Sequence, residues 1–193
     1  MIKIDSSLDP LLDIKQWRKP QFWRDSFLYY WIFSLFGHIL ELFWGFAGLQ
    51  LGLKTPEKFA SIPIFAIAAP YGLGAIILIL FVYPLVRQRK IGIIGAFFLS
   101  TVLTTIVEII SALAIVIVLG DNPYWDYSNR SFNLFGFATL GNSLAFGVAS
   151  IIALYLVFPL ISSVRKKFNE KLLNWAFWII VIGYAATLLN NLR

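Results

Sequence analysis

The chain has 193 residues, of which 59% are hydrophobic and only 13% are charged. Soluble domains carry about 45–50% apolar and about 25% charged residues, so this composition excludes an ordinary water-soluble domain and predicts an integral membrane protein. The sequence has no Cys and a single His, which excludes disulfides and a Cys nucleophile and leaves few ligands for a metal. We therefore expect no cofactor.

Residues 1–24 are predicted to form a cytoplasmic juxtamembrane segment, and residues 25–193 a single transmembrane helical domain. Between residues 7 and 23, apolar side chains alternate with charged ones, and Pro10 and Pro20 interrupt the pattern. Such a segment is typical of a chain lying in the lipid headgroup layer. Docking of a cytoplasmic partner is the alternative interpretation.

Five stretches are long and apolar enough to cross a bilayer, since a spanning helix needs about 20 mostly apolar residues. They cover about residues 26–49, 64–86, 91–119, 134–161 and 175–189. Transmembrane strands alternate over about 10 residues, and these stretches are apolar throughout. The predicted fold class is all-α: a polytopic membrane helix bundle of about five spans.

The basic residues predict the orientation of these spans, because Lys and Arg are enriched in cytoplasmic loops. Twelve of the 16 lie in the N-terminal segment and in the second and fourth connections: Lys3, Lys15, Arg18, Lys19, Arg24, Arg87, Arg89, Lys90, Arg165, Lys166, Lys167 and Lys171. The other side holds four: Lys54, Lys58, Arg130 and Arg193. The N-terminus is therefore expected on the cytoplasmic side and the C-terminus outside, with the chain crossing the cell membrane several times. The net charge of +6 reflects this topology and not a nucleic-acid partner.

The first predicted span carries Ser34, His38 and Glu41 on one helical face. Polar or ionisable side chains are costly in hydrocarbon and are functional candidates by default, so His38 and Glu41 are candidate solute-binding residues. A local His38–Glu41 pair is the alternative. In the second span, Pro70 is followed by Tyr71 and two glycines, and we expect a break in the helix there, with Tyr71 as a further candidate.

The third span bears a stripe of Thr and Ser around Glu108. Thr and Ser in membrane helices often bond the carbonyl four residues earlier, so the stripe alone favours packing. At a rise of about 1.5 Å per residue, Glu41 and Glu108 lie roughly 12–17 Å below the outer ends of their helices. Asn142 of the fourth span and Pro70 fall at a similar level. We therefore predict one outward-facing polar cavity that includes Glu41, Glu108, Tyr71 and Asn142.

The connection over this layer, residues 122–133, is rich in aromatic and hydrogen-bonding side chains. It is expected to form an ordered lid, with further candidate binding residues Trp125, Asp126, Tyr127, Arg130 and Asn133. The alternative is an aromatic interfacial belt with a local Asp126–Arg130 pair. In the fourth span, Gly141, Ala145 and Ala149 recur every four residues and predict a close helix-packing face, inside the bundle or toward a partner subunit.

Several of these residues together resemble a known family. The loop Trp125-Asp126-Tyr127-Ser128, followed by Phe132-Asn133 and Gly136, is similar to the most distinctive motif of the ABC-transporter type IV (CmpB-like) membrane protein family. Gly37 to Glu41, Pro70-Tyr71-Gly72-Leu73-Gly74 and Glu108 resemble further parts of its pattern, over roughly residues 28–190. The resemblance implies a membrane component of an ABC transport system and carries over no catalytic chemistry.

Three functions follow as hypotheses. The first is a transport component that binds a small solute and relies on a separate cytoplasmic ATPase, because the chain has no Gly-x-x-x-x-Gly-Lys-[Ser/Thr] loop. The second is a membrane-embedded enzyme acting on lipid or a lipid-linked substrate, although no catalytic constellation is recognisable. The third is a non-catalytic assembly or regulatory subunit of a membrane complex. The expected partners are the bilayer and an ABC ATPase or other membrane subunits, with homo-oligomerisation left open.

Overall fold

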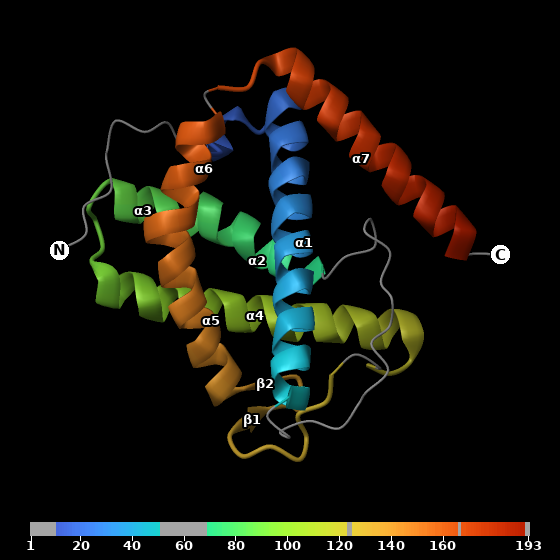
Figure 1. The fold of residues 1–193 in the computed structure, drawn as a ribbon. Helices are drawn as coiled ribbons and strands as arrows, with labels where there is room; N and C mark the ends of the chain where they lie inside the picture. The colour runs from blue at the N-terminus through green and yellow to red at the C-terminus, as the bar shows by residue number, and fades with distance from the viewer. Residues whose placement is uncertain (1–10, 51–68, 123–124, 166, 192–193) are drawn as a thin grey trace. The chain divides into compact units, whose positions relative to one another are not determined.

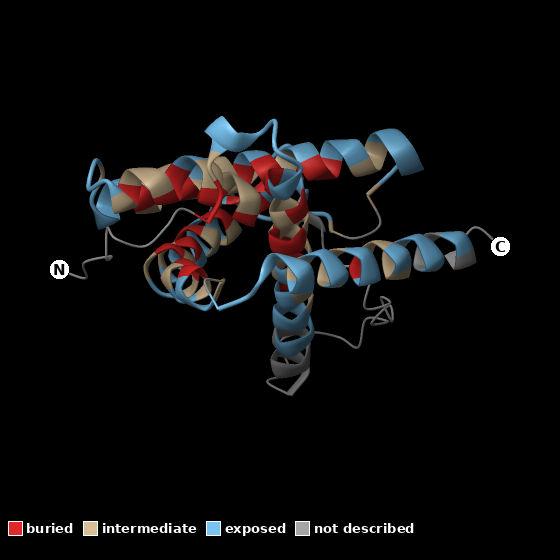
Figure 2. Cartoon of the chain, turned by 90° about the horizontal axis from the view of Figure 1, so that it is seen from above, coloured by how far each residue is buried: buried red, intermediate tan, exposed pale blue. Residues whose placement is uncertain are grey.

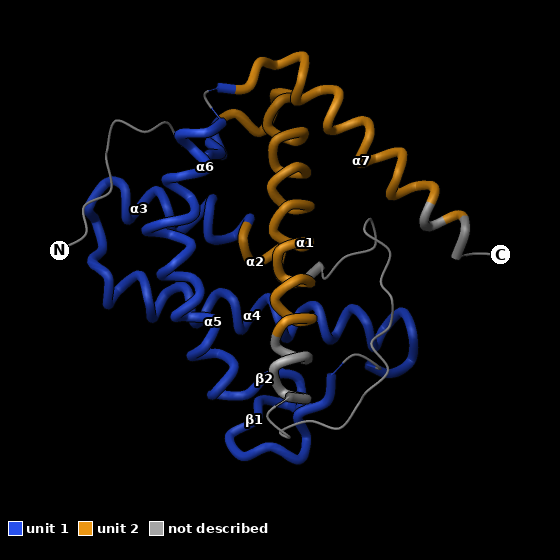
Figure 3. Tube along the Cα trace, in the orientation of Figure 1, with its two compact units in different colours: residues 1–15, 76–167 blue, residues 16–75, 168–193 orange. Residues whose placement is uncertain are grey.

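A computed structural model describes residues 11–50, 69–122, 125–165 and 167–191. These residues are almost entirely helical (Figure 1), with one two-stranded hairpin. The chain divides into two compact units (Figure 3), one of residues 1–15 and 76–167 and the other of residues 16–75 and 168–193. We describe each unit by itself. The helical membrane bundle predicted from the sequence is confirmed as the fold class.

The second unit contains α1 (Pro20–Gln50), the start of α2 (Ala69–Ile77) and α7 (Glu170–Asn191). Helix α1 begins at Pro20, a residue suited to the first helical position because its missing N–H would be unpaired there anyway. It therefore starts inside the segment that we predicted to precede the first span. Helix α7 is capped by Asn169, whose Oδ1 accepts a hydrogen bond from Leu172 N at 2.8 Å. The two helices are in contact, and the rings of Phe27 and Phe177 meet edge to face at 5.4 Å.

The first unit contains the first two residues of the short 3-10 turn η1 (Ile14–Gln16). It also contains the rest of the helices. In chain order these are the end of α2, the π-helical segment η2 (Leu78–Val82), α3 (Tyr83–Arg87), α4 (Ile93–Leu119), the strands β1 (Asn133–Leu134) and β2 (Ala138–Thr139), α5 (Leu140–Ile152), the π-helical segment η3 (Ala153–Val157) and α6 (Phe158–Arg165). Helix α4 packs along α5 and also contacts η2 and β2. This packing carries the core of the unit.

Two prolines explain the π-helical segments. A proline inside a helix has no N–H to donate, and its ring clashes with the carbonyl four residues earlier. The widened π turn relieves that clash. Just before Pro84, the N–H of Tyr83 bonds Leu78 O, and just before Pro159, the N–H of Phe158 bonds Ala153 O. The two segments contact each other, and the Tyr83 and Phe158 rings lie 5.5 Å apart, edge to face.

Helix α4 has the opposite distribution of polar and apolar side chains to a helix of a soluble protein. Its buried positions are mostly small or polar, and its exposed positions are large and apolar; buried and exposed positions alternate along the helices in Figure 2. The exposed set recurs every three or four residues: Ile94, Phe98, Val102, Ile106, Ile110, Leu113 and Ile117. Lipid tails are as apolar as Leu, so membrane helices place small residues at their contacts and large apolar ones toward lipid. This helix is therefore suited to a bilayer.

Within the described residues, four helices are long and apolar enough to cross a membrane: Pro20–Phe43, Pro70–Arg87, Ile93–Leu119 and Leu140–Arg165. They correspond to the first four predicted spans. The start of the second predicted span, near residue 64, and the chain before the expected break at Pro70 lie outside the described residues. The fifth predicted span, 175–189, is helical within α7, and its crossing of the membrane remains a prediction.

Helices α4 and α5 meet at a glycine other than those predicted. A Cβ on Gly147 would overlap Thr101 Oγ1 and lie 2.7 Å from Phe97 Cε2. The expected internal packing positions Gly141, Ala145 and Ala149 are instead exposed, and a Cβ on Gly141 would meet nothing within 4 Å. At 100° per residue, Gly147 lies about 200° from Ala145, so α5 turns its opposite face to α4.

Candidate functional site

The connection between α4 and α5 is an ordered hairpin. Strands β1 and β2 pair antiparallel, with Asn133 opposite Thr139. Asn133 joins the loop to the hairpin, because its Nδ2 donates to Arg130 O at 2.9 Å and its Oδ1 accepts from Gly136 N at 2.9 Å. The predicted binding residue Asn133 therefore uses both ends of its side chain inside the loop. The loop is structured, as expected, and its role as a lid remains a prediction.

Asp126 organises the turn that follows it. Its Oδ1 accepts hydrogen bonds from the Ser128 hydroxyl at 2.6 Å and the Ser128 N–H at 2.8 Å. These two bonds, the hydroxyl first, hold the pKa of the exposed Asp126 carboxyl below its ordinary value. The alternative pair with Arg130 is not formed among the described residues: Arg130 is exposed, and it bonds the turn through its backbone, with its N–H donating to Tyr127 O at 2.8 Å. Ser128 competes successfully because it lies two residues away in a tight turn.

Gly136 permits this turn to close. Its φ of +74° is in the left-handed region that favours glycine, and a Cβ would lie 2.6 Å from Ser128 Oγ. Its carbonyl accepts from Tyr127 N at 2.9 Å. Trp125 is fixed nearby, because its indole Nε1 donates to Phe137 O at 3.0 Å. The family-like motif from Trp125 to Gly136 is therefore one hydrogen-bonded unit.

A pocket of about 320 Å³ opens between the end of α4 and this hairpin. Trp125 and Asp126, two residues predicted from the sequence, line it, together with Asp121, Asn122 and Ser128. Val116, Phe135, Gly136 and Phe137 complete its lining. Asp121 directly follows Gly120, whose φ of +89° ends α4, and this helix-stop signal could have drawn attention to it. Among the described residues no group of three His, Cys, Asp or Glu side chains could hold a metal ion.

Glu108 lies on α4, two turns before Val116, and is buried with 7% of its surface exposed. Its Oε2 has no hydrogen-bond partner among the described residues, and the same holds for the hydroxyls of Ser111 and Ser143. The threonines of the stripe behave differently: Thr101, Thr104 and Thr105 each bond the carbonyl four residues earlier, at 2.7–2.9 Å. Their polarity is thus satisfied locally, as the packing interpretation predicts, whereas the buried Glu108 keeps unused acceptor capacity.

Asn142 is half-buried in the first turn of α5, the helix that packs along α4. Its backbone N–H bonds Thr139 Oγ1 at 3.2 Å, which makes Thr139 the N-cap of α5. Tyr127 is half-buried in the loop. The first unit thus contains seven of the predicted residues: Glu108, Trp125, Asp126, Tyr127, Arg130, Asn133 and Asn142.

The second unit contains the other three, and two glycines bring α1 and α2 together there. A Cβ on Gly37 would collide with the Tyr71 ring, and one on Gly72 would collide with Ser34 Oγ and Tyr30 O. Tyr71 therefore seats its ring on the space left by Gly37, which explains the Gly and Pro-Tyr-Gly motifs as packing elements.

His38 and Glu41 continue along α1. His38 is half-buried, and its Nδ1 has no partner within the described residues, whereas Glu41 is exposed. No ion pair joins these two side chains in the part of the chain that is described. Because Glu41 and Glu108 belong to different units, the single cavity predicted for them remains a prediction.

The sequence analysis missed a polar cluster at the start of α1. Arg24 is 6% exposed, and its guanidinium bonds Asp25 Oδ1 at 2.8 Å and Asn174 Oδ1 at 2.7 Å. It also forms an ion pair with Glu170 at 2.7 Å. From the sequence, Arg24 is predicted only to be one of the basic residues that set the membrane orientation. The adjacent Asp25 at the entry of a span was the available signal that the charge is paired.

Comparison with known proteins gives one finding. A family model described as "Putative ABC-transporter type IV" matches residues 28–191. No curated protein and no solved structure matches the chain. The matched range includes both units and all ten predicted site residues.

Proposed function

The chain belongs to the ABC-transporter type IV family, and on this basis we propose that it is the membrane-spanning component of an ABC-type transport system that binds a small solute and relies on a separate ATPase. Membership and the four apolar helices make it a membrane protein of a transport family. The solute site, the ATPase and the location in the cell membrane are the parts that we propose.

The pocket beside the hairpin is the observation that best supports solute binding. With about 320 Å³, it falls in the range of about 300–1,000 Å³ that is usual for small-molecule sites. It combines carboxylates, an amide and a hydroxyl with aromatic side chains, which is the usual mixture of apolar walls and a few orienting polar groups. Most of its lining residues belong to one hydrogen-bonded loop, so these parts of the wall are held in place before a solute arrives.

The charges of the pocket favour a small cation. Asp121 and Asp126 both line it, and no Lys or Arg among the described residues does. The lowered pKa of Asp126 keeps this carboxyl ionised at neutral pH. The indole of Trp125 adds an aromatic face, and a cation over such a face gains about 0.5–1 kcal/mol at an exposed site. A small organic ammonium ion satisfies both features. In the same unit, Glu108 and Asn142 are proposed to bind the solute at greater depth. Solute binding by His38, Glu41 and Tyr71 of the other unit is a separate proposal that rests on the sequence pattern.

A separate chain is proposed to supply the energy, and the absence of a phosphate-binding loop of the Walker type from the 193 residues fits this division of roles. Arg165 at the end of α6, Lys167 in the connection before α7 and Lys171 in the first turn of α7 lie on the side predicted to be cytoplasmic. We propose this connection as the place where a cytoplasmic ATPase docks.

Two experiments test the proposal. Titration of the purified protein with methylammonium, ethanolamine and choline should show saturable binding that Asp121→Asn and Asp126→Asn weaken. Asp13→Asn, which removes the same charge outside the pocket, is the matched control and should bind normally. Pulldown in mild detergent should recover an ATPase. Binding that is insensitive to both pocket substitutions contradicts the solute site, and repeated pulldowns without an ATPase contradict the transport assignment.

A further inference from the structure

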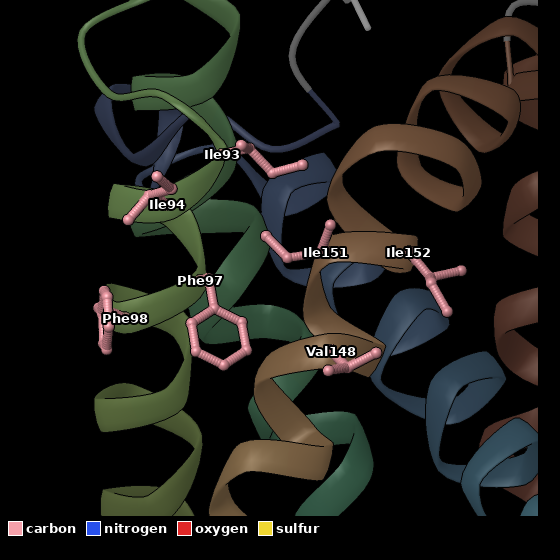
Figure 4. A pocket seen from close by; sticks show the side chains of 7 residues that line it. All are labelled: Ile93, Ile94, Phe97, Phe98, Val148, Ile151 and Ile152. Carbon is pink, nitrogen blue, oxygen red and sulfur yellow. The ribbon is translucent and has the colours of Figure 1, made fainter. Parts of the chain in front are cut away.

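An apolar groove of about 440 Å³ lies between α4 and α5, at the end of the helix pair away from the hairpin. Figure 4 shows the side chains around it, with Phe97 reaching between the helices. All seven lining residues are large and apolar: Ile93, Ile94, Phe97, Phe98, Val148, Ile151 and Ile152. Five of them are exposed, from 49% at Ile93 to 71% at Ile94. The groove is therefore open on the outer surface of the helix pair.

The groove follows from where the helices touch. The helices approach closely at Gly147, which has no side chain to separate α5 from Thr101. One turn further toward the start of α4, large side chains stand on both helices and hold them apart. The groove lies in the first two turns of a span, where a water molecule would find no polar partner. Its contents must be apolar.

The start of α4 adds positive charge at one end of the groove. Arg89 and Lys90 are both exposed and precede Ile93 by three or four residues. A tight turn holds them there, because Arg89 N bonds Val86 O at 3.0 Å and Lys90 N bonds Leu85 O at 2.9 Å. Next to them, a Cβ on Gly92 would meet nothing within 4 Å, so the space beside the two charges is open.

The charges of Arg89 and Lys90 are not paired with acidic side chains among the described residues. The sequence has no Asp or Glu in residues 58–107 or 127–169, which include α3, the start of α4 and all of α5 and α6. An anionic ligand would therefore meet positive charge that no described acidic side chain pairs, directly beside an apolar groove.

We propose that this groove binds an acyl chain of an anionic phospholipid, with Arg89 and Lys90 on its phosphate headgroup. A phospholipid in a bilayer has this arrangement, a charged group at the level of the helix end and an apolar chain running along the helix. Basic pockets between transmembrane helices on the cytoplasmic side are suited to such headgroups, and the basic residues predict that this end of α4 is cytoplasmic. A second copy of the chain is the competing occupant, and the experiments below separate the two.

Native mass spectrometry of the full chain in mild detergent tests the site. Phosphatidylglycerol and phosphatidylcholine of equal acyl length are the probes. The wild type should retain one phosphatidylglycerol in preference to phosphatidylcholine. The double variant Arg89→Gln/Lys90→Gln should weaken this retention about 25-fold, at roughly fivefold per charge, and leave phosphatidylcholine unchanged. The double variant Arg18→Gln/Lys19→Gln removes two adjacent exposed charges elsewhere and should behave as the wild type.

A second pair of variants tests the groove itself. Val148→Phe places a ring in the groove from an exposed position and should reduce retention of both lipids. Val102→Phe makes the same change at a similarly exposed position of α4 outside the groove and should have no effect. Equal retention of the two lipids by the wild type, or retention that Val148→Phe leaves intact, overturns the proposal. A dimer that forms without lipid and is broken by Val148→Phe assigns the groove to a second copy and overturns it as well.

Discussion

Replacement of Gly147 by alanine should separate α4 from α5. The added Cβ would overlap Thr101 Oγ1 and lie 2.7 Å from Phe97 Cε2, which is 0.7 Å short of the 3.4 Å where ordinary contact begins. Thr101 cannot simply rotate away without cost, because its hydroxyl donates to Phe97 O at 2.9 Å. Forcing an extra carbon into a packed contact costs about 1–3 kcal/mol.

Gly141→Ala is the matched control, since it makes the same chemical change on the same helix where a Cβ would meet nothing within 4 Å. Both substitutions gain the same helix propensity, about 0.5–1 kcal/mol, so this gain cancels in their difference. The two variants should therefore differ by the cost of overlap alone, about 1–3 kcal/mol. At roughly 2–4 °C per kcal/mol for a chain of this size, that difference is measurable as the midpoint of thermal unfolding in detergent.

The result that would refute this reasoning is a Gly147→Ala protein that unfolds at the same temperature as Gly141→Ala. If both variants were destabilised equally, α5 would use its Gly141 face for packing in the same way as its Gly147 face. Gly147→Ala combined with Phe97→Leu should recover part of the loss, since a smaller side chain leaves room for the new carbon.

The remaining predictions concern orientation and two polar clusters. In this chain without cysteine, Asn129→Cys should react with an impermeant thiol reagent added outside cells and Lys167→Cys should not; the reverse would contradict the predicted topology. Arg24→Leu should lower the free energy of unfolding by at least about 1.5–3 kcal/mol, the value of one hydrogen bond to a charged group. Glu170→Gln should cost less than about 1 kcal/mol because the Glu170 side chain is 61% exposed; equal losses in denaturation experiments would show that Arg24 does not centre the cluster. Asp126→Ala should speed amide exchange at Ser128. In the wild type, the turn should stay ordered as the pH falls to about 4, near the ordinary Asp pKa of about 3.9, and should open only below the lowered pKa of Asp126. Loss of amide protection at Ser128 above pH 4 would contradict the two hydrogen bonds.

Part of this protein could be predicted from the sequence because it depends on local properties. Runs of about 20 apolar residues and the clustering of basic residues between them are one-dimensional patterns, and the bilayer thickness converts them into helices. The turn formers between Asn122 and Asn133 likewise predicted a structured loop, since Asp126 and Ser128 bond within a few residues of each other. The helix of the fifth predicted span followed from the same kind of pattern.

The rest was decided by contacts between residues far apart in the sequence. The spacing of Gly141, Ala145 and Ala149 is typical of a packing face, yet which face of α5 meets α4 depends on the side chains of α4, and Thr101 and Phe97 fit only Gly147. Asp121 and Phe137 come to line one pocket because the hairpin folds back on the end of α4. Arg24 forms an ion pair with Glu170 and donates a hydrogen bond to Asn174, both about 150 positions away. Periodicity shows which residues share a helix face, and only tertiary packing determines what that face meets.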